Sequence, residues 1–167
     1  MRYPNIIVYH GSDRAVTQPD TEHSRLRVDF GKGFYTTPLY EQAKKWCEKY
    51  KTQRKKAVIS HYELAVSVYD QCAVLTFEAY TEAWLDLILA YRTGTDSTAD
   101  VCNRYDIIEG GVANDKVFNT VELVLDGLID KKEAIKRLKY EKPNWQICFK
   151  NQLTIDRYVT YKGSEEL

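Results

Sequence analysis

The chain has 167 residues, and its 24 lysine and arginine side chains balance 24 aspartate and glutamate side chains, so the formal net charge is zero. This length is typical of one domain that can bury a core, and we expect a single domain over residues 1–167. The charge balance excludes a general electrostatic attraction to nucleic acid, although a local basic patch stays open.

Cysteine usage and the lack of long apolar runs indicate the compartment. The four cysteines are widely separated, and the three histidines lack metal-ligand spacing to any of them. Charge and proline appear by Arg2 and Pro4, which is unlike a signal segment, and the longest apolar stretch, around residues 84–90, is too short to span a bilayer. We therefore expect a cytoplasmic protein with reduced cysteines, no metal site and no membrane partner.

The first half of the chain alternates apolar runs with polar or proline-containing breaks. A continuous β-branched run predicts a buried strand, and the helical spacing of Ala43, Trp46 and Cys47 predicts a helix after Pro38. The predicted elements are a strand at 6–9, a long polar loop at 11–32, a strand at 33–37, a helix at 40–50 and a strand at 57–64. A loop of this length is often functional.

The second half predicts more helices and short strands. Trp84, Leu85 and Ile88 lie on the apolar face of an amphipathic helix, and Asp130 followed by Glu133 fits a helix N-cap. The predicted elements are a helix at 77–91, a strand at 105–108, helices at 115–126 and 131–140, a strand at 146–149, an extended piece at 158–161 and a frayed tail at 163–167. The mixture predicts an α+β fold.

Two short runs near the N-terminus carry the functional signal. Tyr9-His10-Gly11-Ser12 places a His-Gly step at the end of a strand, and residues 29–37 form a glycine-broken loop that leads into an aromatic strand. Neither glycine cluster precedes a helix, as a phosphate-binding loop would. A polar, partly aromatic pocket floored by two strands fits better.

These runs resemble the ADP-ribosyltransferase superfamily, in its diphtheria-toxin and poly(ADP-ribose) polymerase branch. That branch has a His-Gly-Ser/Thr strand end, a Phe-Gly-Lys-Gly-x-Tyr segment and a second aromatic residue on the next helix, which corresponds to Trp46. Within it, the chain resembles a family of short bacterial proteins, domain of unknown function 3990, which it also resembles at residues 112–115 and 140–144. The resemblance implies ADP-ribosyltransferase-like split mixed and antiparallel β-sheets flanked by helices.

The resemblance also implies a role for each matching residue, with NAD as the substrate. Gly11 would hold the nicotinamide carboxamide through its backbone, which a glycine lets approach closely. His10 would bind a ribose hydroxyl, and Tyr35 and Trp46 would stack on the nicotinamide ring. The implied NAD-binding residues are His10, Gly11, Ser12, Gly33, Phe34, Tyr35, Thr36 and Trp46, and the implied catalytic residues are His10, Tyr35 and Gln146.

The chain departs from the superfamily pattern at two positions. Gln146 stands where the superfamily has a glutamate at the start of a late strand, and a neutral amide can accept a ribose hydrogen bond but cannot act as a general base. Glu122 and Glu141 are the nearest carboxylates in the sequence that could compensate. Ala43 stands where the polymerases have a serine, which removes one hydrogen bond to nicotinamide, worth about 1 kcal/mol.

Several of these residues also have an ordinary structural interpretation. His10 alone is typical of a strand end, Trp46 fits a core position as well as a ligand contact, and His61 is expected to have no chemical role. Asn114 and Asp115 fit a helix N-cap, with a substrate-facing loop as the alternative. The basic segment 51–56 fits a solvated helix end, with an acceptor-binding patch as the alternative.

Three functions follow as hypotheses. The first is a mono-ADP-ribosyltransferase that moves ADP-ribose from NAD to a protein or nucleic-acid acceptor, which by family analogy suits a toxin or defence protein with a small antitoxin partner. The second is a module of the same fold that binds NAD or a nucleotide without turnover, which the neutral Gln146 favours. The third is an interaction protein with a vestigial pocket.

Overall fold

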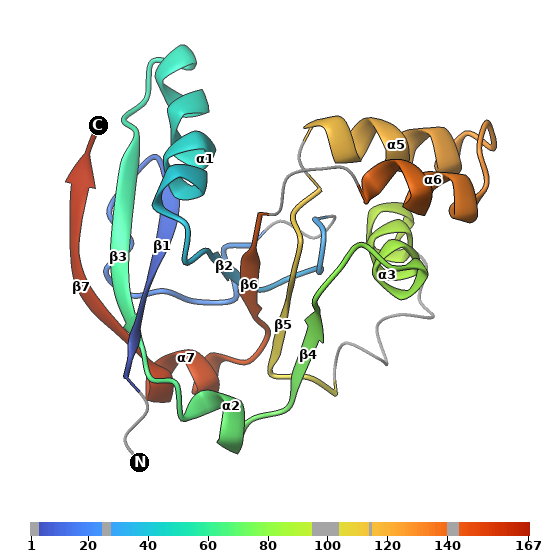
Figure 1. Ribbon diagram of the computed structural model, residues 1–167. Coiled ribbons are helices and arrows are strands. Elements are labelled where there is room, and N and C mark those ends of the chain that lie inside the picture. Colours follow the sequence, from blue (N-terminus) through green and yellow to red (C-terminus); the bar gives the residue numbers. More distant parts are fainter. Residues whose placement is uncertain (1–3, 25–27, 95–103, 114, 140–143) are drawn as a thin grey trace.

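The strands of the computed structural model form two sheets (Figure 1), and the structure describes residues 4–24, 28–94, 104–113, 115–139 and 144–167. Sheet A has the order β1-β3-β7, with β1 (Ile6–Ser12), β3 (Val58–Leu64) and β7 (Val159–Glu166), and it is antiparallel throughout. Sheet B has the order β2-β6-β5-β4, with β2 (Phe34–Thr36), β6 (Gln146–Phe149), β5 (Ile107–Gly110) and β4 (Val74–Phe77). Only the β4–β5 pair of sheet B is parallel, so the predicted α+β class with mixed and antiparallel sheets is confirmed.

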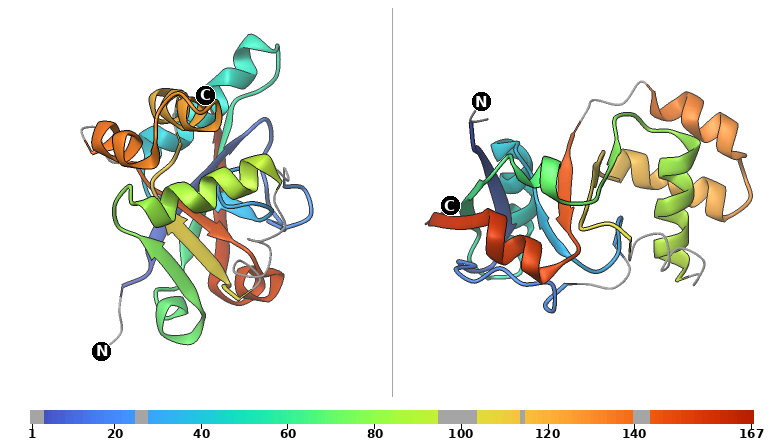
Figure 2. Two further views of the ribbon diagram at one scale, coloured as in Figure 1. Left: turned by 90° about the vertical axis from the view of Figure 1, so that its right-hand side faces the viewer. Right: turned by 90° about the horizontal axis from the view of Figure 1, so that it is seen from below.

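Helices cover the outer faces of both sheets. The helices among the described residues are α1 (Tyr40–Thr52), α2 (Val68–Gln71), α3 (Glu82–Thr93), α5 (Asp115–Leu125), α6 (Lys131–Leu138) and α7 (Gln152–Tyr158). Figures 1 and 2 show α3, α5 and α6 on the side of sheet B that faces away from sheet A, and α1 against β1. None of the described helices is long and apolar enough to cross a bilayer.

Successive side chains of β5 and β6 point to opposite faces of sheet B and so divide the core into two parts. Ile107 and Ile147 pack between the sheets, together with residues of β1 and β3, whereas Ile108 and Cys148 pack against the helices α3, α5 and α6. Every residue of β5 and β6 is buried for this reason, because both faces of these strands are covered. Gln146 shares the helix-covered face with Cys148, two residues along the strand.

Most of the predicted elements are confirmed within a residue or two. The strands expected at 6–9, 33–37, 57–64, 105–108 and 146–149 appear as β1, β2, β3, β5 and β6. β1 continues to Ser12, three residues beyond its predicted end, so the start of the loop predicted for 11–32 is strand that pairs with β3. Asp130 caps α6, because its Oδ1 accepts a hydrogen bond from the backbone N–H of Glu133 over 2.8 Å. The helix expected at 131–140 ends at Leu138.

The helix predicted for 77–91 is wrong in its first turn. Phe77 ends strand β4, which the prediction missed, and α3 begins only at Glu82. Thr81 is the N-cap, with its hydroxyl accepting from the backbone N–H of Trp84 over 3.2 Å. The apolar run through Phe77 therefore belongs to a strand that pairs with β5. A short apolar run fits both the helical and the strand periodicity, so it does not distinguish a helix from a strand.

The frayed tail predicted for 163–167 is also wrong. Strand β7 continues to Glu166 along β3, and the backbone N–H of Leu167 donates to the carbonyl of Ala57 over 2.9 Å. The segment is polar because it is an edge strand that is exposed along much of its length. The short helices α2 and α7 were not predicted either.

Candidate functional site

A cleft of about 920 Å³ opens where strands β1 and β2 diverge. Its lining includes residues of β1, the following loop, β2, helix α1, the end of α3 and the start of β6. Of the residues singled out by sequence, the cleft brings together His10, Gly11, Ser12, Gly33, Phe34, Tyr35, Trp46 and Gln146. Thr36 is fully buried and is not part of the lining, so it is the one member of the predicted set that lies away from the cleft.

The divergence of β1 from β2 is created by the His10 side chain. Tyr9 and Thr37 form a single antiparallel bridge, with backbone hydrogen bonds of 2.8 and 2.9 Å. A regular ladder would next pair Gly11 with Tyr35. Instead, Nδ1 of His10 lies 2.7 Å from the carbonyl oxygen of Tyr35 and takes the place of that backbone partner.

Gly11 presents its backbone to the cleft for the same reason. In the antiparallel β1–β3 pair, the N–H and C=O of Gly11 point to the same edge as those of Tyr9, away from β3. A Cβ on Gly11 would lie only 2.2 Å from the carbonyl oxygen of Ala43, so helix α1 packs directly on this glycine. The site therefore offers the backbone N–H and C=O of Gly11, with no side chain on this residue, beside the face of α1 that carries Trp46.

His10 is held in one tautomer. Because a carbonyl oxygen can only accept, Nδ1 carries the proton when the ring is neutral, and Nε2 is left as an acceptor. Burial lowers the pKa of His10 below 6.5, and the hydrogen bond to the Tyr35 carbonyl offsets part of this effect. The Phe34 ring lies 4.7 Å from the imidazole, centre to centre, and restricts its tilt. Neutral His10 thus offers the cleft a hydrogen-bond acceptor.

Tyr35 is fixed at both ends of its side chain. Its hydroxyl donates to the carbonyl of Gly31 over 2.5 Å and accepts from the backbone N–H of Phe30 over 3.1 Å. Burial raises the pKa of this hydroxyl well above its usual range, and the nearby Cys148 and Asp29 raise it further. The ring is therefore a neutral aromatic surface, locked to the glycine-broken loop that precedes it.

Trp46 lies on the cleft side of α1. It is half-buried, and it belongs to none of the buried clusters, whereas its neighbours Ala43 and Cys47 on the same helix are fully buried. A large aromatic side chain that faces an open cleft is suited to stacking on a planar ligand. Trp46 therefore lines the cleft and does not occupy a buried core position.

The remaining predicted residues of the two runs have local roles. The Ser12 hydroxyl donates to the carbonyl of Arg14 over 2.7 Å and closes a turn. A Cβ on Gly33 would lie 2.4 Å from Sγ of Cys148, so this glycine permits close packing on β6. Phe34 is buried between the sheets, and the Thr36 hydroxyl points to the carbonyl of Ile147 at 3.5 Å.

Gln146 has a partner that the sequence did not reveal. Its Nε2 donates to Oδ2 of Asp29 over 2.9 Å and to the carbonyl of Gly111 at 3.3 Å. Asp29 is 6% exposed, and its other oxygen accepts from Arg92 over 2.6 Å. The charged group on this wall of the cleft is thus Asp29, in an ion pair with the last turn of α3.

The carboxylates that the sequence suggested as substitutes are elsewhere. Glu122 is exposed on α5 and does not line the cleft, and Glu141 lies outside the described residues. Asp29 was missed because an aspartate in a polar loop usually marks a turn. Its position next to the Phe-Gly-Lys-Gly run was the one available signal.

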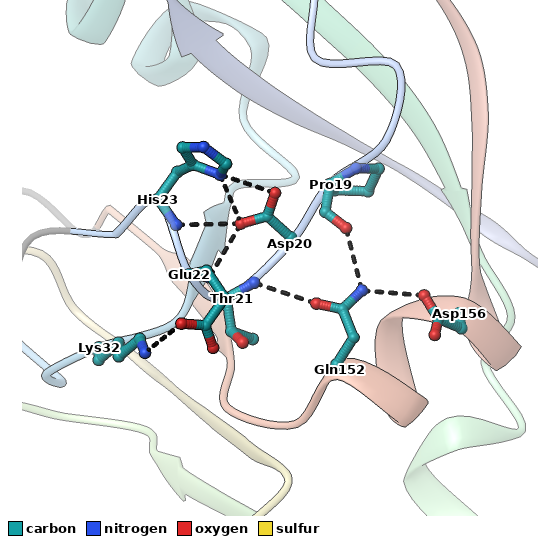
Figure 3. Close-up of polar contacts among 8 residues, drawn as sticks. All are labelled: Pro19, Asp20, Thr21, Glu22, His23, Lys32, Gln152 and Asp156. Atoms are coloured by element: carbon teal, nitrogen blue, oxygen red, sulfur yellow. Dashed lines mark hydrogen bonds and ion pairs between the residues drawn. The ribbon is translucent and has the colours of Figure 1, made fainter.

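One loop of the cleft wall is tied to helix α7 (Figure 3). Gln152, the first residue of α7, accepts from the N–H of Thr21 over 3.1 Å and donates to the carbonyl of Pro19 over 3.2 Å. Oδ1 of Asp20 accepts from the N–H of His23 over 3.0 Å and closes the turn. These contacts hold a segment of the long loop at the cleft, where Asp20 and His23 contribute to the lining.

Three further predictions concern residues outside the cleft lining. The basic segment 51–56 is exposed, and Lys56 pairs with Glu166 across 3.0 Å at the surface, as a solvated helix end would. His61 contacts Glu165 through Nε2 at 3.0 Å. Asn114 lies outside the described residues, and Asp115 is the first residue of α5.

Comparison with known proteins gives a match to a protein family. A family model described as "Protein of unknown function (DUF3990)" matches residues 6–161, which include all the cleft-lining residues from His10 to Gln146. No curated protein and no solved structure matches the chain. Strands β1 to β6, the cleft and both N-terminal runs fall within the matched segment, and the chain belongs to the DUF3990 family.

Proposed function

We propose that the protein is an NAD-dependent ADP-ribosyltransferase, which cleaves the bond between nicotinamide and ribose and transfers ADP-ribose to a macromolecular acceptor. The observation that carries the proposal is the convergence of separate segments on one cleft of about 920 Å³. The residues that converge are His10, Gly11, Tyr35, Trp46 and Gln146.

The geometry of the cleft supports a binding mode for the nicotinamide end of NAD. A carboxamide has one acceptor and two donors, which complements the backbone N–H and C=O of Gly11. The ring would lie against Tyr35 and Trp46, because a cationic pyridinium is attracted to the faces of aromatic side chains. Nε2 of His10 would accept a hydrogen bond from a ribose hydroxyl, since Nδ1 already donates to the Tyr35 carbonyl.

The proposed reaction is dissociative. The bond between C1′ of the ribose and the ring nitrogen breaks with its electron pair, so nicotinamide leaves as a neutral molecule and positive charge develops on the ribose. A nucleophile of the acceptor then bonds to C1′ and loses its proton to solvent. The Oε1 atom of Gln146 would accept a ribose hydroxyl hydrogen bond, and the fixed aromatic and histidine groups would hold the reactive conformer.

Nicotinamide release from NAD by the purified protein tests the proposal. His10→Ala and Tyr35→Ala should each lower the rate at least about tenfold, since each removes an interaction worth about 1.4 kcal/mol or more. His61→Ala is the matched control, because this histidine lies on sheet A and does not line the cleft. Equal rates for wild type, both cleft variants and the control would refute the assignment of these residues.

The proposed transfer also requires a macromolecular acceptor for ADP-ribose, and a labelling experiment identifies its class. Incubation of labelled NAD with a cell lysate, followed by separation of protein and nucleic acid, should place the label in one fraction. A toxin or defence role, with a small antitoxin partner, rests on the family analogy alone. Growth arrest on expression of the wild type, but not of His10→Ala, is the outcome expected of a toxin.

A second candidate is an NAD-binding module without turnover. The observation that favours it is Gln146, whose neutral amide is already engaged with Asp29. Calorimetric binding of NAD with no nicotinamide released during long incubation would select this function over the first.

A further inference from the structure

Asp29 joins four segments of the chain at the wall of the cleft. Its Oδ1 accepts from Arg92 over 2.6 Å, and its Oδ2 accepts from the backbone N–H of Ala113 over 2.8 Å and from Nε2 of Gln146 over 2.9 Å. The Asp29 side chain is 7% exposed, so these three donors and the Arg92 charge replace its hydration.

These contacts determine which way the Gln146 amide faces. Nε2 lies within hydrogen-bond distance of the Asp29 carboxylate and of the Gly111 carbonyl, and both partners can only accept. A flipped amide would turn Oε1 toward two other acceptors, so the orientation is fixed by the chemistry of the neighbours. Because Gln146 lines the cleft, Oε1 is the atom that remains to accept a hydrogen bond from a ligand.

The same geometry accounts for glutamine at this position. A glutamate in place of Gln146 would put a second carboxylate oxygen where Nε2 now lies, 2.9 Å from Asp29. Two carboxylates at that separation cannot both ionise without a large energetic penalty. The negative charge on this wall is therefore carried by Asp29, behind Gln146. The Gln146 amide, which Asp29 polarises, transmits the effect of that charge to the ligand.

We propose that Asp29 is a positioning residue, which holds Gln146 so that Oε1 accepts a hydrogen bond from a hydroxyl of the nicotinamide ribose. This inference rests on the proposed function. A carboxylate that accepts a hydrogen bond from the amide nitrogen increases the negative charge on Oε1. That polarisation stabilises the positive charge that develops on the ribose in the transition state more than it stabilises the ground state, in which the ribose is uncharged.

The kinetic test uses the near-isosteric variant Asp29→Asn and the exchanged pair Asp29→Asn with Gln146→Glu. Asp29→Asn should lower kcat for nicotinamide release by about tenfold or more while KM for NAD changes less than about threefold. Gln146→Glu should also lower kcat, because it places the new carboxylate directly against that of Asp29. In the exchanged pair, the amide introduced by Asp29→Asn can donate to the carboxylate introduced by Gln146→Glu, so kcat should recover at least about fivefold over Gln146→Glu alone. Asp126→Asn, an exposed carboxylate after α5, is the control.

A kcat for Asp29→Asn equal to that of the control, or an exchanged pair no better than Gln146→Glu, would overturn the positioning role. A purely structural role for Asp29 predicts lower melting temperature without rescue, so melting temperatures are measured on every variant.

A second measurement does not depend on turnover. In the wild-type protein, the side-chain amide resonances of Gln146, assigned by their loss in Gln146→Ala, should be shifted and slow to exchange with solvent. Freely exchanging resonances at ordinary shifts would overturn the inference even if Asp29→Asn fails to fold. If the wild type releases no nicotinamide but these resonances are protected, the proposed function fails while the fixed orientation of Gln146 stands.

Discussion

Nδ1 of His10 lies 2.7 Å from the carbonyl oxygen of Tyr35, at the point where β1 and β2 separate. The imidazole takes the place of a backbone partner, and the edge of β1 beyond the Tyr9–Thr37 bridge is thereby left open to the cleft. One side chain therefore both opens the site and lines it. Its protonation state should affect the stability of the fold as well as binding.

The stability of the protein should fall as the pH drops below about 6.5 because of His10. Burial lowers the pKa of the folded-state ring below 6.5, so the unfolded chain binds a proton more readily. The contribution is fully present above 6.5 and is lost as the pH falls through the folded-state pKa. Urea unfolding between pH 7.5 and 5 should show this slope in the wild type and less of it in His10→Gln. Identical slopes in the two proteins would contradict the prediction.

Gly11→Ala should destabilise the fold by about 1–3 kcal/mol, the usual range for overpacking. The new Cβ would lie 2.2 Å from the backbone carbonyl oxygen of Ala43, and no side-chain rearrangement on α1 can relieve a clash with backbone. Helix α1 must shift, and Trp46 shifts with it. Thermal unfolding measures the loss, and Thr160→Ala on the exposed part of β7 is the surface control, expected within about 0.5 kcal/mol of wild type.

Tyr35→Phe should cost about 1–3 kcal/mol, because it leaves the Gly31 carbonyl and the Phe30 N–H without their partner. Tyr161→Phe is the matched control, since that hydroxyl bonds to Ser164 near the surface over 3.1 Å. Chemical denaturation should separate the two variants by at least about 1 kcal/mol. Equal losses would mean that the Tyr35 hydroxyl does not anchor the loop.

Arg92→Ala should cost about 3–5 kcal/mol, because it leaves the Asp29 carboxylate buried without its cation. Arg92 also lies over the Phe118 ring at 4.4 Å, so packing between α3 and α5 is lost as well. Lys131→Ala breaks an exposed pair with Asp86, which solvent screens, and should cost far less than Arg92→Ala. A small loss for Arg92→Ala in urea unfolding would show that Asp29 is hydrated in solution.

Local sequence patterns predicted much of the fold and part of the site. The β-branched run before Tyr9 and the Asp130 cap with Glu133 depend on neighbours a few residues away, and both appear as expected. Phe77 was assigned to a helix because its pairing with β5 is a tertiary contact that helical spacing cannot reveal. The polar end of β7 was likewise taken for a frayed tail, since the partner that orders it, β3, is remote in sequence.

The sequence by itself determined the α+β class, the His-Gly step and the glycine-broken aromatic run, because each is written in adjacent residues and their backbone preferences. Only the tertiary structure decided that Trp46 faces the cleft and that Asp29 pairs with both Arg92 and Gln146. The physical reason is that a buried charge is stabilised by donors that converge from separate segments. Side chains that meet in this way leave no periodic pattern along the chain.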